Sequence, residues 1–396
     1  MASLSECQAV VFAAGRGNRM PSLTNHISKA LLPVANVPLC WFPLNLLRLN
    51  RVRDCLLVVP REQHVHIESA LKAGGERWPS LPKMVIEVVS FDHEEEGQDV
   101  DDWGTADVLK RLLGKLKRDN ILLISGDLVS DVRLHDMFKQ YTETNAVLSC
   151  LLTDAALGGP VPGPKERVKK YRDFSMLGPD GQLLFLVDEE DYVEEDGVPF
   201  SLFNRCPKVK ATAKYKDVHL YLVQRRALDL LLSKKSKISS SFSSIKADLV
   251  PRIVQRAKCV AWVPAAADFS MIAQCNNVGA YFGANTTILK LLPAPLCPQL
   301  RPPEVGSKCQ LKKSVIGNDC VLGDCAKVDN SVLMDGVVIG KGATVKDSIL
   351  FGNARVGERA NVTLCIIGPG QEAQTKEKYA NTAIVEEKTM VLDYDD

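Results

Sequence analysis

The residues with the clearest chemical potential follow the first apolar segment of the chain. Residues 8–14 form a short apolar run, the sequence GRGNRM follows at positions 15–20, and Lys29 stands nine residues further on. A glycine-rich turn after a buried strand lets backbone N–H groups approach phosphate oxygens closely. Positive side chains nearby would neutralise a triphosphate. The segment therefore predicts a phosphate-binding turn that contains Gly15, Gly17, Arg19 and Lys29.

Two common phosphate-binding motifs do not fit this turn. The dinucleotide pattern Gly-x-Gly-x-x-Gly requires glycine where Met20 stands, and the chain has no Gly-Lys-Ser/Thr ending of a P-loop here. Taken alone, Gly-x-Gly is also typical of tight turns that bind nothing, so that alternative stays open.

Two later segments carry further candidate residues. Gly104 and Thr105 open a helical pattern, although Thr105 as an ordinary N-cap explains this pair without a ligand. Asp127 follows the apolar run 120–125, and ligands of open α/β sheets bind at the carboxyl ends of such strands. A carboxylate at that place often holds Mg²⁺ that bridges phosphates, so Asp127 is the candidate metal ligand. An ordinary turn at the end of a strand is the competing explanation.

The first 260 residues alternate between apolar runs and helical patterns. Strand-like runs occupy 8–14, 54–60, 84–90, 120–125 and 146–152, and helical patterns occupy 39–49, 64–72, 105–116 and 134–142. Such alternation predicts an α/β domain with a mostly parallel sheet that is covered on both faces. The sequence GPDG at 178–181 predicts a hairpin turn between two further strands.

A 17-residue repeat occupies the last third of the chain. Gly306, Gly323, Gly340 and Gly357 are spaced evenly, and aliphatic residues recur in register with them. The aliphatic columns are Val305, Leu322, Ile339 and Val356; Leu311, Val328, Val345 and Val362; and Val315, Val332, Ile349 and Ile366. Three hexapeptide-like steps per repeat predict a left-handed parallel β-helix of about four coils, with aliphatic residues stacked in its interior. In the second copy, Leu322, Val328 and Leu333 or Met334 mark the three successive corners.

These patterns divide the chain into four parts. We expect an α/β domain over 1–260, a linker over 261–300 with a proline-rich end, a β-helix over 301–370 and a C-terminal tail over 371–396. Five prolines between positions 293 and 303 predict a semi-rigid spacer.

Composition excludes several classes of protein. The chain has 396 residues, with 49 Lys and Arg against 48 Asp and Glu, and this balance argues against a nucleic-acid binder. No uncharged apolar run approaches the roughly 18 residues that cross a membrane, and no secretory signal is expected at the N-terminus. The 12 cysteines are scattered without a Cys-x-x-Cys pair, which predicts reduced thiols and a cytosolic, cytoplasmic protein.

The three motifs, followed by a β-helix, resemble the nucleotidyltransferase family of sugar-nucleotide pyrophosphorylases. That family has Gly-x-Gly-x-Arg-Met, Leu-Thr, Pro-Lys-Pro-Leu-Leu-Pro and Pro-Leu; this chain has GRGNRM at 15–20, LT at 23–24, SKALLP at 28–33 and PL at 38–39. The resemblance implies transfer of a nucleotide from an NTP to a sugar 1-phosphate, with Mg²⁺ held by two Asp.

The departures from that family concern the sugar half of the site. Ser28 and Ala30 replace the prolines around Lys29, and no Glu-Lys-Pro segment stands near Asp188. DVHLY at 217–221 replaces Asn-Ala-Gly-Ile-Tyr, and no second metal Asp stands in a recognisable context. We therefore expect the nucleotide half to be partly kept and the sugar half to be lost.

With this loss, the chain resembles one branch of the family, the gamma subunits of eukaryotic translation initiation factor 2B. The similarity rests on WFPLNLL at 41–47, GTAD at 104–107, GDLVSDV at 126–132 and YRDF at 171–174. It implies a non-catalytic, regulatory subunit of a complex that exchanges GDP for GTP on initiation factor 2. The implied partners are the epsilon subunit, which carries the exchange domain, the other subunits of factor 2B, and initiation factor 2.

The resemblance implies no cofactor of the chain's own. An inherited GTP and Mg²⁺ site would consist of Gly15, Gly17, Arg19, Lys29, Gly104 and Asp127. The alternative function is an active sugar-1-phosphate nucleotidyltransferase of the mannose-1-phosphate guanylyltransferase type. A hexapeptide acyltransferase is disfavoured, because such enzymes generally need a His base near the solenoid and all six His precede it.

Overall fold

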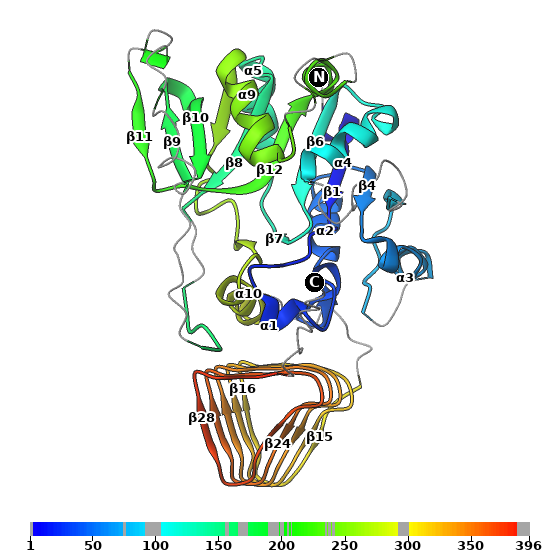
Figure 1. Ribbon diagram of the computed structural model, residues 1–396, viewed down its shortest axis with the longest axis vertical. Helices are drawn as coiled ribbons and strands as arrows, with labels where there is room; N and C mark the ends of the chain where they lie inside the picture. Colours follow the sequence, from blue (N-terminus) through cyan, green and yellow to red (C-terminus); the bar gives the residue numbers. More distant parts are fainter. Residues whose placement is uncertain are drawn as a thin grey trace, which may run out of the picture.

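A computed structural model describes most of the chain. The described residues are 3–73, 77–91, 104–154, 158–164, 173–188, 198, 202–203, 206, 208–233, 236, 239, 242–291 and 301–385. They form an α/β domain and, below it in Figure 1, a prism of stacked coils. The predicted fold class is confirmed. In this part of the chain, no helix combines the length and the apolar character that crossing a membrane requires.

A ten-stranded mixed sheet forms the centre of the first domain. In spatial order its strands are β11 (Lys210–Thr212), β9 (Asp173–Leu177), β10 (Gln182–Asp188), β13 (Cys259–Trp262), β8 (Leu148–Thr153), β12 (Lys216–Gln224), β6 (Asn120–Ser125), β1 (Gln8–Phe12), β4 (Asp54–Val58) and β5 (Val85–Val89). The pairs β6–β1, β1–β4, β4–β5 and β13–β8 are parallel. The long strand β12 runs antiparallel to both of its neighbours.

Helices cover both faces of this sheet. Side chains alternate between the two faces along each strand, so each face carries its own apolar cluster that a helix layer buries. Val10 of β1 belongs to one apolar cluster, whereas Ala9 and Val11 belong to the other. The helices in the described part of the domain are α1 (Pro21–Thr24), α2 (Trp41–Leu49), α3 (Arg61–Ala73), α4 (Thr105–Leu112), α5 (His135–Glu143), α8 (Arg225–Leu232), α9 (Val250–Arg256) and α10 (Val278–Leu291). This layering leaves the carboxyl ends of the parallel strands accessible to a ligand.

Residues 261–291 belong to the α/β domain and not to the predicted linker. Strand β14 (Ile272–Gln274) pairs antiparallel with β7 (Leu128–Ser130), and α10 follows it. The fully buried Tyr281 of α10 donates a hydrogen bond to the Pro33 carbonyl at 2.6 Å. Because α10 is apolar on more than one side, its sequence lacks the amphipathic period of a surface helix. The proline-rich end at 292–300 lies outside the described residues.

The β-helix consists of three parallel sheets of five strands each. The first contains β15 (Glu304–Val305), β18 (Val321–Leu322), β21 (Val338–Ile339), β24 (Arg355–Val356) and β27 (Glu372–Ala373). The second contains β16 (Gln310–Lys312), β19 (Lys327–Asp329), β22 (Thr344–Lys346), β25 (Asn361–Thr363) and β28 (Lys378–Ala380). The third contains β17 (Val315–Ile316), β20 (Val332–Leu333), β23 (Ile349–Leu350), β26 (Ile366–Ile367) and β29 (Ala383–Ile384). The Cα register of each ladder confirms the 17-residue repeat, as in the pair Leu322 and Ile339.

A fifth coil continues past residue 370, where the sequence predicts the start of a tail. Its residues Ala373, Tyr379 and Ala383 pair with Val356, Val362 and Ile366 of the preceding coil. Alanine and tyrosine replace the aliphatic residues at these positions, so the sequence signature fades while the backbone ladder continues. Residues 386–396 of the predicted tail lie outside the described part.

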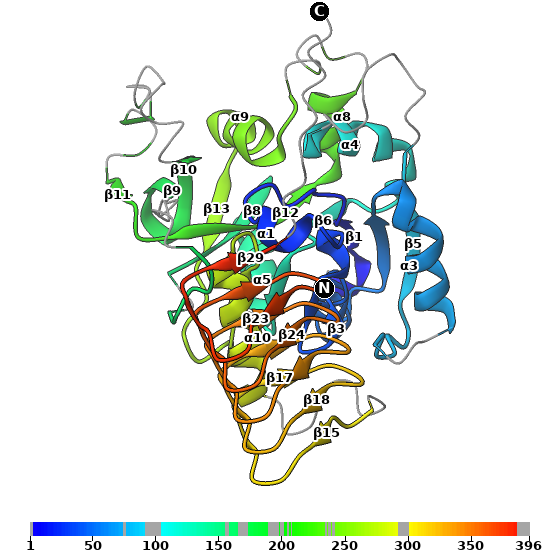
Figure 2. The ribbon, with the colours of Figure 1, turned by 60° about the horizontal axis from the view of Figure 1, so that its bottom comes forward.

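The third sheet of the β-helix packs against the α/β domain. Its column Val315, Val332, Ile349 and Ile366 points out of the prism and into the apolar core of the first domain, whereas Leu333, Leu350 and Ile367 fill the prism. Of the two residues that the sequence offers for the third corner of the second coil, Leu333 lies inside the prism, whereas Met334 belongs to the core of the first domain. Val332 faces the first domain because adjacent residues of a strand face opposite sides. In Figure 1, α10 and α1 lie directly above the prism, and α10 contacts β17 of this sheet. Figure 2 shows β17, β23 and β29 of the same sheet where the prism comes forward.

Polar and aromatic contacts reinforce the junction between the domains. The rings of His26 and Phe351 meet edge to face with centroids 6.3 Å apart. The Asn36 side-chain amide donates to the Ile316 carbonyl at 2.8 Å, and Arg77 forms an ion pair with Asp335. The α/β domain and the β-helix therefore share one buried surface.

Replacing Ile349 tests how much this shared surface stabilises the protein. Ile349 is fully buried in the column that faces the first domain, so we expect Ile349→Ala to lower the free energy of unfolding by about 2–4 kcal/mol. Urea denaturation followed by circular dichroism measures the change. The matched control is Val305→Ala, because Val305 is 54% exposed and its truncation should cost less than about 0.5 kcal/mol. Equal effects of the two variants would contradict the assignment.

Candidate functional site

An open cleft of about 880 Å³ lies at the carboxyl ends of β1, β4 and β6. The structure brings together five of the six predicted residues in its wall, namely Gly15, Gly17, Arg19, Lys29 and Asp127. They come from the turn after β1, from the short 3₁₀ turn Lys29–Leu31 and from the turn after β6. Their convergence follows from the topology, since β1 and β6 are parallel neighbours whose carboxyl ends meet.

The glycine-rich turn is held closed by Thr24. The Thr24 hydroxyl donates to the carbonyls of Gly17 at 3.0 Å and of Met20 at 3.1 Å. Gly17 has φ of +79°, and a Cβ there would lie 2.5 Å from the Thr24 methyl group, so glycine is required. A Cβ on Gly15 would instead meet nothing within 4 Å, so Gly15 leaves open space beside the backbone of the turn.

Asp127 is the centre of a buried polar group. It is 6% exposed, it forms an ion pair with Lys29, and its other carboxylate oxygen accepts a hydrogen bond from the Ser125 hydroxyl at 2.6 Å. Burial alone would raise the pKa of Asp127, but Lys29, Ser125 and the nearby His219 outweigh it and hold this pKa below its ordinary value. Asp127 is therefore ionised at neutral pH and is paired within the chain.

Gly104 has a structural role away from the wall of this cleft. It is the N-cap of α4, and a Cβ on it would lie 2.2 Å from the Ser243 carbonyl oxygen. Thr105 is therefore the first helical residue and not the predicted N-cap. Its hydroxyl accepts a hydrogen bond from the Ile245 N–H at 2.9 Å. Close packing against residues 243–245 thus explains the Gly-Thr pair.

Sequence reasoning missed several polar residues of the cleft, among them His219, Gln274 and Asn276. His219 has φ of +55° and lies where the pairing of β12 with β8 shifts register. Burial lowers the pKa of His219, which favours the neutral ring at pH 7. Gln274 and Asn276 flank Cys275, whose backbone N–H donates to the Asp127 carbonyl at 2.9 Å. For these three residues, the sequence signal was the segment DVHLY at 217–221, which contains His219 and departs from the Asn-Ala-Gly-Ile-Tyr pattern.

A second polar cluster, the Lys246 cluster, lies behind His219 and consists of Asp173, Asp188, Asp217 and Lys246. Lys246 Nζ contacts Asp173 at 2.7 Å and Asp188 at 2.8 Å, and Asp173 accepts the backbone N–H of Asp217 at 2.5 Å. Burial and a hydrogen bond with Asp188 raise the pKa of Asp173 to about 7, against the lowering effect of Lys246. These contacts tie β9, β10 and β12 to the π-helical turn Ile245–Leu249.

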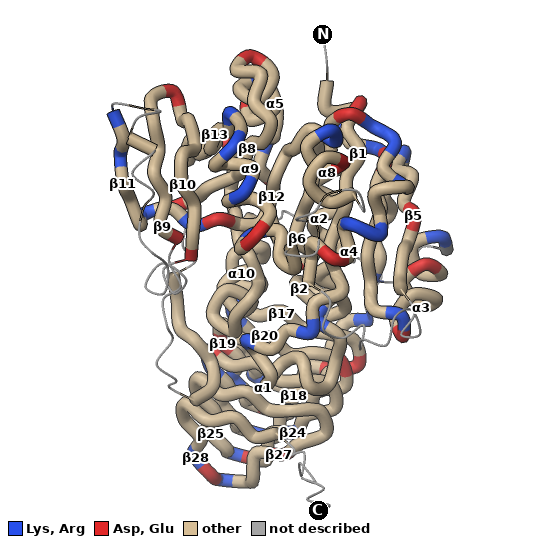
Figure 3. The backbone as a smooth tube through the Cα atoms, turned by 45° about the horizontal axis from the view of Figure 1, so that its top comes forward, with Lys and Arg blue, Asp and Glu red and all other residues tan. Residues whose placement is uncertain are grey.

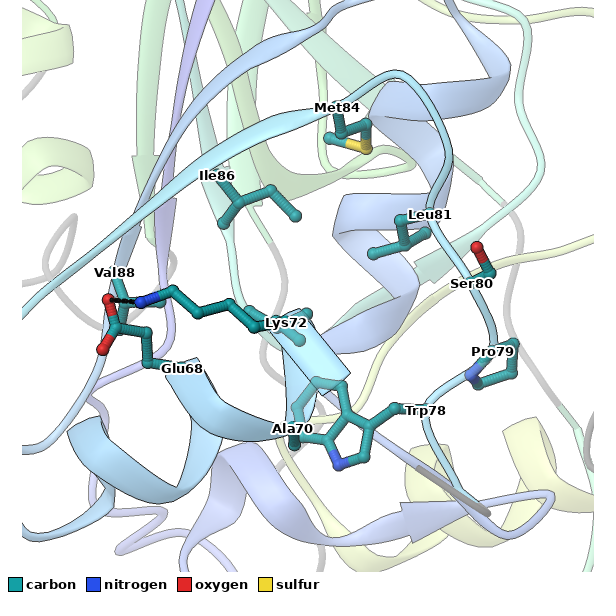
Figure 4. A pocket seen from close by; sticks show the side chains of 11 residues that line it. Glu68, Ala70, Lys72, Trp78, Pro79, Ser80, Leu81, Met84, Ile86 and Val88 are labelled. Carbon is teal, nitrogen blue, oxygen red and sulfur yellow. Dashed lines mark ion pairs between the residues drawn. The ribbon is translucent and has the colours of Figure 1, made fainter. Parts of the chain in front are cut away.

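Figure 4 shows a separate pocket of about 430 Å³ between α3, the segment 78–81 and β5. Its wall includes the apolar side chains of Trp78, Leu81, Met84 and Ile86. Among the described residues of this wall, the basic residue is Lys72, which is paired with Glu68 at 2.8 Å. The described wall therefore carries no unpaired positive charge for a phosphate ligand.

The described part of the chain contains no group of three or more His, Cys, Asp or Glu side chains arranged to hold a metal ion. Its cysteines are free thiols, and all of them except Cys309 and Cys325 are buried, as small apolar groups are. Lys, Arg, Asp and Glu are interspersed over both domains in Figure 3, in line with the balanced composition.

The ten-stranded sheet, the cleft at its strand ends and the appended β-helix define a nucleotidyltransferase-like protein. The family description "Nucleotidyl transferase" matches residues 8–157, and "GMPPB C-terminal domain" matches residues 302–393. The glucose-1-phosphate thymidylyltransferase of Xanthomonas campestris is 33% identical over 76 residues, which is 19% of this chain and 25% of that enzyme.

Similarity over a longer span identifies the particular family. The translation initiation factor eIF2B subunit gamma of Caenorhabditis elegans is 32% identical over 297 residues, covering 72% of this chain and 69% of that protein. The subunit of the same name from Schizosaccharomyces pombe is 24% identical, covering 63% of this chain and 51% of that protein. The chain belongs to the family of translation initiation factor eIF2B gamma subunits. It spans between about half and about two thirds of the length of these relatives.

Replacing Lys246 tests whether it neutralises the buried carboxylates. We expect Lys246→Met to lower the free energy of unfolding by about 3 kcal/mol at pH 7.5, because the carboxylates lose their cation. Lys246 lowers the pKa of both Asp173 and Asp188, so in the variant the folded state binds protons more readily than the unfolded state. The loss should therefore shrink as the pH falls from 7.5 to 5.5.

Urea denaturation at the two pH values measures this effect. The control Lys72→Met breaks the exposed Lys72–Glu68 pair and should change stability by less than about 1 kcal/mol at either pH. A loss for Lys246→Met that is independent of pH would contradict the electrostatic explanation.

Proposed function

We propose that this chain is a non-catalytic, regulatory subunit of the eIF2B complex in the cytosol. In this proposal the complex promotes exchange of GDP for GTP on initiation factor 2, and the chain assembles with a catalytic epsilon subunit and the other subunits. The similarity to gamma subunits over 72% of the chain supports the proposal. The proposed role requires neither nucleic-acid nor membrane binding.

The composition of the cleft argues against nucleotide transfer by this chain. In the enzymes that it resembles, two Asp hold the Mg²⁺ that activates the phosphates. Here the one carboxylate at the end of β6, Asp127, is paired with Lys29, and the residues beside it are the amides Gln274 and Asn276. The pairing of Asp127 with Lys29, beside neutral amides and not a second Asp, is the observation that carries the proposal of a degenerate active site.

The first coil of the β-helix offers a surface for assembly. Val305 and Leu311 occupy columns whose next members, Leu322 and Val328, are buried. In the first coil the same positions are 54% and 44% exposed. Open ends of solenoids expose both apolar side chains and strand edges, which is why they need a cap or a partner. We expect a partner subunit to cover this end.

Purification from the native cells tests the proposed function. The tagged chain should copurify with the other eIF2B subunits in stoichiometric amounts, and the isolated chain should not accelerate GDP release from initiation factor 2. A homo-oligomer without these partners would contradict the proposal. The alternative function is an active sugar-1-phosphate nucleotidyltransferase of the mannose-1-phosphate guanylyltransferase type, which pyrophosphate release from GTP and mannose 1-phosphate would support.

Charge introduced at the first coil tests the assembly surface. We expect Leu311→Glu to reduce the copurified subunits severalfold, because a buried carboxylate opposes docking. Leu230→Glu is the matched control, since Leu230 lies on α8 of the other domain and is 65% exposed. Subunit ratios from quantitative mass spectrometry give the readout. Unchanged ratios for Leu311→Glu would exclude this end of the β-helix from the interface.

A further inference from the structure

We propose that the second sheet of the β-helix binds an acidic, extended segment of a partner protein. The surface is the outward side of β16, β19, β22, β25 and β28 and is called here the lysine face, after Lys312, Lys327, Lys346 and Lys378. The lysine face is separate from the first-coil end that the proposed function uses, and its role does not depend on that function.

Alternation along the strands places the side chains of the lysine face in solvent. Val328, Val345 and Val362, the middle residues of β19, β22 and β25, fill the prism, so the residues on either side of each valine point outward. All four lysines of the face are exposed. In Figure 1, β28 and β16 mark this side of the prism, at its left. The lysine face is therefore open to solvent in the part of the chain that the structure describes.

Positive charge is concentrated on this side of the prism. The outward positions of the five strands carry the four lysines and one acidic residue, Asp329. The corners that border the face add four basic and two acidic side chains, namely Lys308, Lys313, Arg359, Lys376, Asp347 and Glu377. The outward positions of the first sheet instead carry one basic and two acidic side chains, those of Arg355, Glu304 and Glu372. The second sheet is thus the side that attracts anions.

The lysines of the face form no ion pair within the described part of the chain. There, the ion pairs of the β-helix are Arg77–Asp335 and Arg301–Asp319, and both lie outside the face. Asp329 stands in register between Lys312 and Lys346, which are therefore two strands, or roughly 10 Å, apart. This spacing is close to the Debye length of about 10 Å at 0.1 M salt, so the lysines act on an approaching anion together.

The side chains of the face fit a protein carboxylate better than a nucleic acid. Its outward positions hold Lys, Thr, Asn, Gln, Asp and Ala, with neither arginine nor an aromatic residue. Arginine gives the bidentate contacts that favour phosphate, and aromatic rings stack on unpaired bases. A carboxylate needs only the point charge of a lysine. The five strands form a ladder roughly 20 Å long, which an extended segment of about six residues crosses.

Fluorescence anisotropy on the full chain tests the inference, with a labelled peptide of about eight residues that alternates Glu and Thr as the probe. We expect the peptide to bind, and binding to weaken as the salt concentration rises. Lys327→Glu combined with Lys346→Glu should weaken binding at least about tenfold. Asp329→Asn should tighten binding about threefold, because it removes the negative charge of the face. No binding to the wild-type chain, or weaker binding to Asp329→Asn, would overturn the inference.

A matched control reverses the same number of charges outside the lysine face. Lys139→Glu combined with Arg355→Glu changes exposed residues on α5 and on the first sheet, and its affinity should change by less than about threefold. An equal loss in this control would show attraction to net charge alone and would contradict the assignment of the face. A uridine oligonucleotide of the same charge is the second probe. Tighter binding of the oligonucleotide than of the peptide would make nucleic acid the partner and would reject an acidic protein segment.

Carbodiimide cross-linking of the peptide to the wild-type chain gives a result that does not depend on the folding of a variant. The reagent joins Glu carboxylates to lysine amines, and mass spectrometry should locate the links at Lys327 and Lys346. Links confined to lysines of the α/β domain would exclude the face. Lys327 and Lys346 lie in the second and third coils, so their replacement leaves Val305 and Leu311 of the first coil intact. Copurification of the other subunits and peptide binding can therefore fail independently.

Discussion

The contact between the third sheet of the β-helix and the α/β domain determines how the rest of the molecule is arranged. Aliphatic side chains on this sheet complete the same apolar core that contains β1, α2 and α10. The segment between Met20 and Asn36 lies at this contact, because His26 meets Phe351 and Asn36 bonds to the Ile316 carbonyl. The same segment supplies Thr24 and Lys29 to the cleft. The β-helix therefore packs against the segment that carries Thr24 and Lys29.

Electrostatic pairing within the chain satisfies the buried carboxylates around the cleft. The Lys29–Asp127 pair satisfies the carboxylate at the end of β6. Lys246 pairs with Asp173 and Asp188 in a second network of charges and hydrogen bonds. Both arrangements leave these carboxylates with partners inside the chain.

The two domains offer different kinds of surface. The α/β domain has a polar cleft at the ends of its parallel strands, and the first coil of the β-helix exposes the apolar side chains of Val305 and Leu311. Because the β-helix is held against the cleft through one shared core, the two surfaces keep a fixed relation to each other.

The sequence by itself determined the periodic features, which are the parallel strands and the 17-residue β-helix repeat. It also marked the glycine-rich turn, Lys29 and Asp127 as candidate site residues. These are local patterns, set by side-chain alternation and by turn chemistry. Only the tertiary structure decided that the Val315 to Ile366 column faces outward, that α10 belongs to the first domain and that Gly104 packs against Ser243. Each of these depends on which distant segment covers a given face. One strand's pattern indicates that a face is apolar, but the segment that buries it is set by packing across the whole chain.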